Sequence, residues 1–133
     1  MIKSIAFFFF LAAGCFSQSL NIDHVNPMVG TDSEVKFSHG NTYPAAALPF
    51  GMTAWTPSTG RFDDGWIYQY RAAKINGLKA THQPSPWIGD YGDFSLMPLV
   101  GELRTQFEAR GSRFSHDREI STPYYYAVDL LDS

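Results

Sequence analysis

The sequence has a single cysteine and little charge. Only 17% of its 133 residues are Asp, Glu, Lys or Arg, and the formal net charge is −3. One cysteine excludes a disulfide within the chain. The basic residues are scattered and form no run, so the electrostatic signature of a nucleic-acid-binding protein is missing. We therefore expect no nucleic-acid partner.

Sequence patterns for metal binding and for nucleotide or nucleophile chemistry are also missing. The four histidines, at positions 24, 39, 82 and 116, are spread out, and no cysteine cluster exists that could hold zinc. Residues 32–34 offer too few oxygens for a calcium loop. There is no phosphate-binding glycine loop, dinucleotide fingerprint or nucleophile elbow. We predict that this chain alone binds no metal.

The longest apolar run of the sequence lies at its N-terminus. Lys3 precedes a continuous apolar stretch from Ile5 to Ala13, which is shorter than the roughly 20 residues that span a bilayer. A positive residue, a short apolar run and small residues after it are typical of a secretory signal peptide. We predict a signal peptide over residues 1–17 and an exported bacterial protein that is periplasmic, an outer-membrane lipoprotein or secreted.

Cys15 leaves two processing routes open. Residues 12–15, "AAGC", resemble a bacterial lipobox, in which the cysteine becomes a lipidated first residue and anchors the protein to a membrane. Ala12 stands where that motif prefers leucine. The alternative is ordinary cleavage after Ser17, which removes Cys15.

The rest of the sequence favours short strands. Hydrophobic residues make up 44% and aromatic residues 16%, which argues against disorder. No stretch after Ser19 keeps apolar residues at helical spacing for three turns. Candidate strands alternate with Gly and Pro turns instead, at residues 50–55, 66–71, 78–82, 94–103 and 124–131. Asn76-Gly77 predicts a type I′ hairpin between the second and third. The pattern predicts an all-β, antiparallel β-sandwich. Because the last candidate strand meets the end of the sequence, we expect an incomplete sandwich.

Two loops combine the residue types of a sugar-binding site. Sugar sites need flat aromatic rings and a few fixed polar groups. In "THQPSPWIGDYGD", residues 81–93, two prolines stiffen the loop before Trp87, and His82 and Asp90 flank it. In "HGNTYPAAALPFG", residues 39–51, His39, Asn41 and Thr42 could reach a ligand. The alternative is structural: Trp87 packs onto the sheet, Asp90 forms a turn, and the polar groups of the second loop satisfy its backbone. For Trp66 and Tyr68, on a candidate strand face, we predict a role in the core.

Four segments together resemble a known family. They are "VNPMVGTD" (25–32), "HGNTYPAAALPFGM" (39–52), "THQPSPWIGDYGDFSLMPLVG" (81–101) and "SRFSHDREISTPYYYAV" (112–128). In order and spacing they resemble the N-terminal domain of glycoside hydrolase family 92, the calcium-dependent exo-α-mannosidases of glycan-degrading bacteria. The resemblance implies that residues 18–133 are part of a galactose-mutarotase-like N-terminal β-sandwich.

The resemblance also implies a function and a division of labour. Family enzymes remove terminal mannose from glycans such as N-glycans or mannans, with inversion at the anomeric carbon. Their general acid, general base and calcium ligands lie in a C-terminal (α/α)₆ domain, which this sequence does not contain. The loops here are then expected to add Trp87, Asp90, His82, Asn41 and Thr42 to the mannose pocket.

Carboxylate pairs within the sequence do not suggest catalysis. An inverting glycosidase needs two carboxyl groups about 6.5–9.5 Å apart with room for a water. Asp63 and Asp64 are adjacent, and Asp90 and Asp93 lie three apart in a glycine-containing loop, which is typical of turn formers. We predict no catalytic residue in this chain and no activity of the chain alone. Two other interpretations stay open: a lipid-anchored glycan-binding module without catalysis, and a truncated remnant without function.

Overall fold

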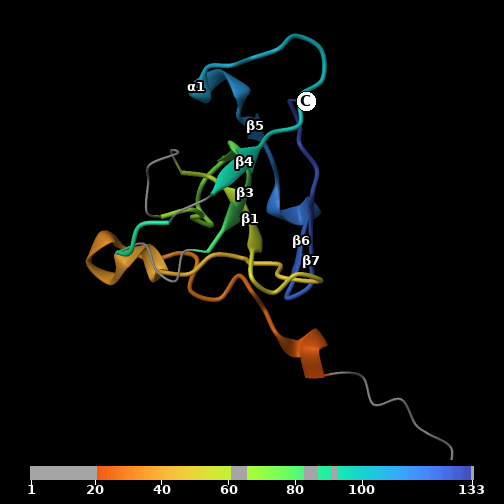
Figure 1. Ribbon diagram of the computed structural model, residues 1–133. Helices are drawn as coiled ribbons and strands as arrows, with labels where there is room; N and C mark the ends of the chain where they lie inside the picture. Colours follow the sequence, from red (N-terminus) through yellow and green to blue (C-terminus); the bar gives the residue numbers. More distant parts are fainter. Residues whose placement is uncertain (1–20, 61–65, 83–86, 91–92, 133) are drawn as a thin grey trace, which may run out of the picture.

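A computed structural model describes residues 21–60, 66–82, 87–90 and 93–132 (Figure 1). The predicted signal peptide over residues 1–17 lies outside these ranges, with Cys15, and so do Asp63 and Asp64. None of the helices in the described ranges is long and apolar enough to cross a membrane.

The described residues form short strands joined by loops and a few helical turns (Figure 1). The strands are β1 (Ala54–Ser58), β2 (Lys74–Ile75), β3 (Gly77–Thr81), β4 (Phe94–Leu96), β5 (Ser112–Arg113), β6 (Glu119–Thr122) and β7 (Tyr125–Val128). The helical segments are the 3₁₀ turns η1 (Asn21–His24), η2 (Val35–Gly40) and η3 (His116–Arg118) and the helix α1 (Phe107–Arg110). The strands outnumber the helical turns, as the sequence predicts.

All strand pairs are antiparallel, which confirms the predicted fold class. β1, β3 and β4 form one sheet in the order β1-β3-β4, whereas β2 pairs with β5 and β6 with β7. In the first sheet, Ala54 lies opposite Thr81 and Ser58 lies opposite Gly77. β4 ends at Leu96, two residues before Pro98. Proline has no backbone N–H to continue a strand ladder, so the predicted strand over 94–103 is cut short.

The predicted hairpin at Asn76-Gly77 is wrong. Residues 66–71 are not a strand, and the strand before the dipeptide, β2, pairs with β5 rather than with β3. Gly77 has no positive φ, which a type I′ turn requires. The glycine serves close strand approach instead, because a Cβ atom at Gly77 would lie 2.2 Å from the Ser95 Oγ. The local dipeptide pattern therefore reflects packing between β3 and β4.

The hairpin of β6 and β7 lies beside the first sheet and forms a second layer (Figure 1). Pro123 and Tyr124 form its turn, and Thr122 pairs with Tyr125. The buried hydrophobic residues among those described are Ile67, Tyr68, Ile75, Ala80 and Phe114. Tyr68 is only 1% exposed, which confirms its predicted core role.

A buried carboxylate ties the hairpin to the core. The Glu119 side chain is 2% exposed. The hydroxyl groups of Tyr126 and Tyr68 donate hydrogen bonds to it, at 2.6 and 3.0 Å, and the His116 Nδ1 lies 2.5 Å from it. Burial, together with the negative charge of Glu119, raises the pKa of both tyrosines, so both stay neutral donors. Glu119 thus joins β6, β7 and the core segment through charge-assisted hydrogen bonds.

Loss of one hydroxyl should measure the strength of this junction. We expect Tyr126→Phe to lower the free energy of unfolding by about 1.5–3 kcal/mol, since a hydrogen bond to a buried charge is lost. Denaturant unfolding checks this. Tyr125→Phe is the matched control, because Tyr125 is 53% exposed, and it should change stability by less than about 0.5 kcal/mol. Equal stability of the two variants would contradict the role given to Glu119.

Candidate functional site

The two predicted binding loops lie at the same edge of the first sheet. The first loop runs into β1, and the second loop leaves β3. Because Ala54 of β1 lies opposite Thr81 of β3, the residues just outside this pair, Thr53 and His82, are neighbours. Thr53 Oγ1 lies 3.1 Å from His82 Nε2. Strand pairing therefore places two segments that are distant in sequence side by side.

Asp90 fastens the second loop to the end of β3. Its side chain is 4% exposed, and Oδ2 accepts hydrogen bonds from the Thr81 hydroxyl at 2.5 Å and from the His82 backbone N–H at 3.1 Å. Oδ1 lies 3.6 Å from His82 Nδ1. Asp90 and His82, both predicted from sequence as binding residues, are thus brought together. The carboxylate faces protein donors, while the His82 side chain is 32% exposed.

Tyr43 of the first loop also lies near this junction. Burial raises the pKa of its hydroxyl, the negative charge of Asp90 adds to the rise, and hydrogen bonding to Thr81 opposes it. Tyr43 and Asp90 therefore both lie beside Thr81, the buried last residue of β3. The first and second loops are coupled there through Thr81.

Three aromatic rings join the loops at a second point. Trp87 is 68% exposed and packs edge-to-face against Trp66, with ring centroids 5.4 Å apart. Trp66 packs in the same way against His39, at 5.2 Å. The Trp66 indole N–H donates a 2.6 Å hydrogen bond to the Ser38 carbonyl. Trp66, which was predicted to be a core residue, is half-buried between the loops.

The start of the first loop, residues 39–41, and the preceding Ser38 have a left-handed backbone. Ser38, His39 and Asn41 have φ values of 56°, 52° and 59°, and Gly40 has a φ of 92°. Such angles are uncommon for residues with a side chain and indicate a backbone fixed by its surroundings. Gly40 approaches Gly30 so closely that a Cβ atom would lie 1.9 Å from the Gly30 carbonyl oxygen. Only glycine fits here.

Asn41 and Thr42 lie on the outer side of this loop. Both are exposed. The Asn41 backbone N–H donates to the Ser38 carbonyl at 2.9 Å, and the Thr42 hydroxyl donates to the Val29 carbonyl at 2.9 Å. The Thr42 hydroxyl thus satisfies the Val29 carbonyl, and Asn41 is exposed to solvent.

Sequence reasoning missed three residues of this site: Trp66, Tyr43 and Thr53. Trp66 was placed on a strand face because residues 66–71 alternate like a strand. Tyr43 and Thr53 lie in or beside the predicted loops, and the proline-bounded setting of Tyr43 was the only local signal. Their proximity depends on β1–β3 pairing, which no local pattern encodes.

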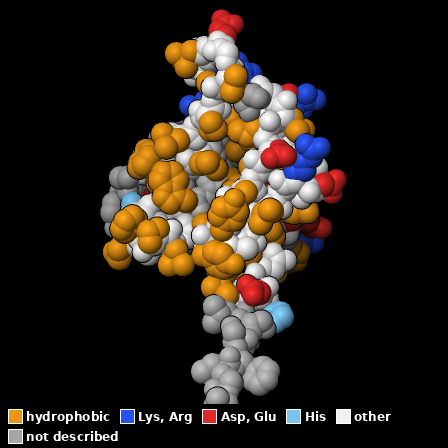
Figure 2. All heavy atoms as spheres, turned by 90° about the vertical axis from the view of Figure 1, so that its right-hand side faces the viewer, with side chains coloured by type: hydrophobic (Ala, Val, Ile, Leu, Met, Phe, Trp, Pro, Cys, Tyr) orange, Lys and Arg blue, Asp and Glu red, His pale blue; other side chains and the backbone are white. Residues whose placement is uncertain are grey.

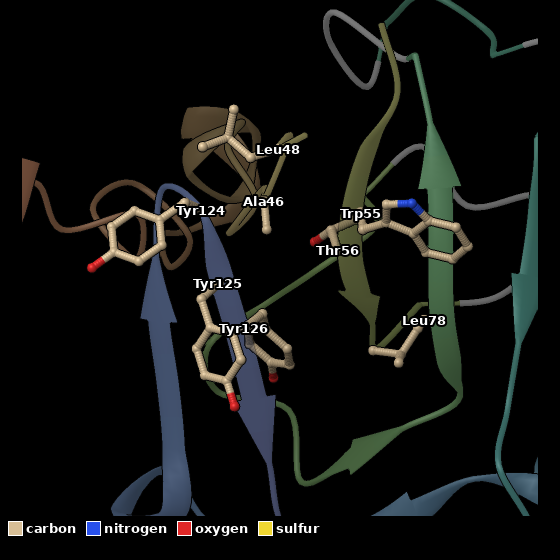
Figure 3. Close-up of a pocket in the computed structure, with 8 residues that line it drawn as sticks. All are labelled: Ala46, Leu48, Trp55, Thr56, Leu78, Tyr124, Tyr125 and Tyr126. Atoms are coloured by element: carbon tan, nitrogen blue, oxygen red, sulfur yellow. The ribbon is translucent and has the colours of Figure 1, made fainter. Parts of the chain in front are cut away.

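A separate cleft lies between the two layers (Figure 3). Its volume is about 250 Å³, with Tyr124, Tyr125 and Tyr126 on one side and Trp55, Thr56 and Leu78 on the other. Ala46 and Leu48 complete the lining. The lining is mainly apolar and lacks the converging polar groups that read sugar hydroxyls. The polar and aromatic edge of the first sheet is therefore the better candidate for a sugar site.

The described residues contain no group of three or more His, Cys, Asp or Glu side chains that could hold a metal ion.

Comparison with known families decides the relationship. The model of the glycosyl hydrolase family 92 N-terminal domain matches residues 24–133. The chain belongs to this family. Comparison with curated proteins gave no match.

Solved structures of family 92 enzymes share the fold. An inverting mannosidase of Bacteroides thetaiotaomicron is 53% identical over 83% of this chain, with a TM-score of 0.76. An α-mannosidase of the same organism is 39% identical over 82%, with a TM-score of 0.66, and has also been solved with mannoimidazole bound. The chain covers 15% of the length of each of these two proteins. It thus corresponds to a small part of a long family 92 chain.

The buried anchor of the second loop can be tested by mutation. We expect Asp90→Ala to lower the free energy of unfolding by about 1–3 kcal/mol, because the fully buried Thr81 hydroxyl and the His82 N–H lose their acceptor. Asp90→Asn keeps an acceptor oxygen and should lose less. Thermal or denaturant unfolding measures both.

Asp129→Ala is the matched control for this test. Asp129 and its partner Arg118 are both 65% exposed and 3.5 Å apart, so the pair should contribute at most about 1 kcal/mol. If Asp90→Ala unfolds like Asp129→Ala, the anchoring role of Asp90 is wrong.

Proposed function

We propose that residues 18–133 form part of the N-terminal domain of an exported bacterial α-mannosidase. The enzyme hydrolyses terminal α-linked mannose from glycans such as N-glycans or mannans, with inversion. In this proposal the loops at the sheet edge form one wall of the mannose pocket. The general acid, the general base and calcium belong to a C-terminal (α/α)₆ domain, as the family resemblance implies.

One observation carries the proposal: an exposed Trp87 ring packs edge-to-face with Trp66 at the site, in a family whose solved relatives include mannosidases. Sugar C–H faces pack on flat aromatic rings, and the loop residues His82 and Asn41 offer hydrogen-bonding groups. A family 92 α-mannosidase has also been solved in complex with mannoimidazole, which supports a mannose-like ligand for this family. We propose that Trp87 covers the apolar face of the sugar, and that His82 and Asn41 hydrogen-bond its hydroxyls.

Asp90 and Thr42 fix the backbone of the two loops through hydrogen bonds. The buried Asp90 carboxylate holds the backbone of His82, and the Thr42 hydroxyl fixes the first loop against Val29. Both therefore act on the proposed pocket mainly by shaping its wall.

Exposed hydrophobic side chains on the surface of the described residues are consistent with contact to a further domain. Hydrophobic side chains extend over much of the face toward β6 and β7 in Figure 2. Leu48 and Phe50 of the first loop, and Met52 just after it, are 63%, 80% and 86% exposed. Large apolar patches on a protein surface mark interaction sites. We propose that a further domain of the mannosidase covers part of this surface.

A chimeric enzyme tests the proposed pocket. Residues 24–133 replace the matching part of the 53% identical Bacteroides mannosidase, and the unmodified chimera should hydrolyse an α-mannobioside. Trp87→Ala should then reduce kcat/KM by tenfold or more, which is roughly 1.4 kcal/mol of transition-state binding. The melting temperature should change little, because the ring is exposed.

Trp55→Phe is the control, since Trp55 lines the apolar cleft and not the proposed site. It should leave kcat/KM close to that of the chimera. Residues 18–133 alone should release no mannose. Unchanged kcat/KM in a Trp87→Ala enzyme with a lowered melting temperature would show that the ring is structural.

Export is proposed from the N-terminal pattern and is tested by mass spectrometry of the mature protein from a bacterial host. A diacylglyceryl adduct at Cys15 is expected for the lipoprotein route, and a free N-terminus at Gln18 is expected for ordinary cleavage. An intact Met1 on exported protein would contradict both routes.

A further inference from the structure

The exposed tryptophan of the proposed site is oriented by a tryptophan from another segment. The Trp87 and Trp66 rings meet edge-to-face, with an interplanar angle of 78° and centroids 5.4 Å apart. This geometry is the favoured one for aromatic pairs. Trp87 is 68% exposed on its loop. The contact with Trp66 restricts the rotamers that its indole can adopt.

Trp66 is itself fixed by the first loop. Its N–H donates a short hydrogen bond of 2.6 Å to the Ser38 carbonyl, and the His39 ring packs against it at an angle of 80°. One polar and one aromatic contact thus hold the same indole. A ring held by both has little freedom to tilt.

The loop that holds Trp66 is rigid for a separate reason. Its residues 38–41 have left-handed backbone angles, and the approach of Gly40 to Gly30 leaves no room for a Cβ atom. Left-handed angles at non-glycine residues persist only where the surroundings fix them. The Ser38 carbonyl is therefore a fixed acceptor, and the position of Trp66 follows from it.

We propose that Trp66 is a positioning residue that sets the orientation of Trp87 for the glycan. It connects the left-handed loop over residues 38–41 to the ring that meets the sugar. The inference rests on the proposed function, in which Trp87 covers a mannose face. A ring that is oriented before binding loses little conformational freedom when the sugar docks. Trp66 thus contributes to sugar binding through Trp87.

Circular dichroism of the full chain tests the contact itself. Two indoles this close couple their ultraviolet transitions and give a paired positive and negative signal. We expect this couplet in the unmodified chain and in Trp55→Phe, because Trp55 packs on Phe94 and not on Trp66. It should vanish in both Trp66→Leu and Trp87→Leu. Its presence in Trp66→Leu would overturn the proposed pairing.

Kinetics of the chimeric enzyme test the positioning role. We expect Trp66→Leu to lower kcat/KM by about threefold to tenfold, the range of one aromatic pair. Trp66→Phe keeps a ring beside Trp87 but loses the N–H, and should fall between Trp66→Leu and the unmodified enzyme. If Trp66 acts through Trp87, the double variant Trp66→Leu/Trp87→Leu should be no worse than Trp87→Leu alone.

The outcomes separate this inference from the proposed function. Additive losses in the double variant, or full activity of Trp66→Leu beside an impaired Trp87→Leu, would overturn the positioning role and leave the proposed pocket standing. Full activity of Trp87→Leu would overturn the proposed pocket, while the couplet still tests the contact between the rings.

Discussion

The candidate site depends on the antiparallel pairing of β1 with β3. Its register places Ala54 opposite Thr81, so the loop that enters β1 and the loop that leaves β3 start from one point. A one-residue slip would send alternate side chains to the opposite face of the sheet. Thr53 and His82 would then separate. The strand register thus determines which loop residues can meet.

Two buried carboxylates stabilise different parts of this arrangement. Asp90 fastens the second loop to β3, and Glu119 fastens the β6–β7 hairpin to Tyr68 of the core. Burying a charge is costly unless donors compensate it, and each carboxylate is surrounded by protein donors. Each one therefore fixes the segments that hold its donors. Of the exposed groups of the site, His82 is held directly by the Asp90 carboxylate.

The general fold could be predicted because its signals are local. Short apolar segments between Gly and Pro predict short antiparallel strands. β4 and β7 lie within predicted segments, and β3 overlaps one of them. The sequence-based predictions were wrong where the structure depends on contacts between residues that are distant in sequence. Asn76-Gly77 looks like a hairpin turn, yet Gly77 packs closely against Ser95 of the neighbouring strand β4.

The candidate site could be predicted in part for the same reason. Proline-bounded loops with Trp87, His82 and Asp90 were visible in the sequence, and the structure brings His82 and Asp90 together. Trp66, Tyr68 and Tyr70 occupy alternate positions, as residues on one face of a strand would. Only the fold shows that Trp66 contacts Trp87. Sequence alone could not say that the Asp90 carboxylate faces protein donors.

The central claim is that the edge of β1 and β3 forms a wall of a mannose pocket. The most direct measurement is a crystal structure of the chimeric enzyme with mannoimidazole bound. The account predicts the Trp87 ring in van der Waals contact with the sugar ring, about 4 Å away, still edge-to-face with Trp66, and Asp90 still bonded to Thr81. A ligand bound away from Trp87, with the Trp87 ring packed down onto the sheet, would contradict it.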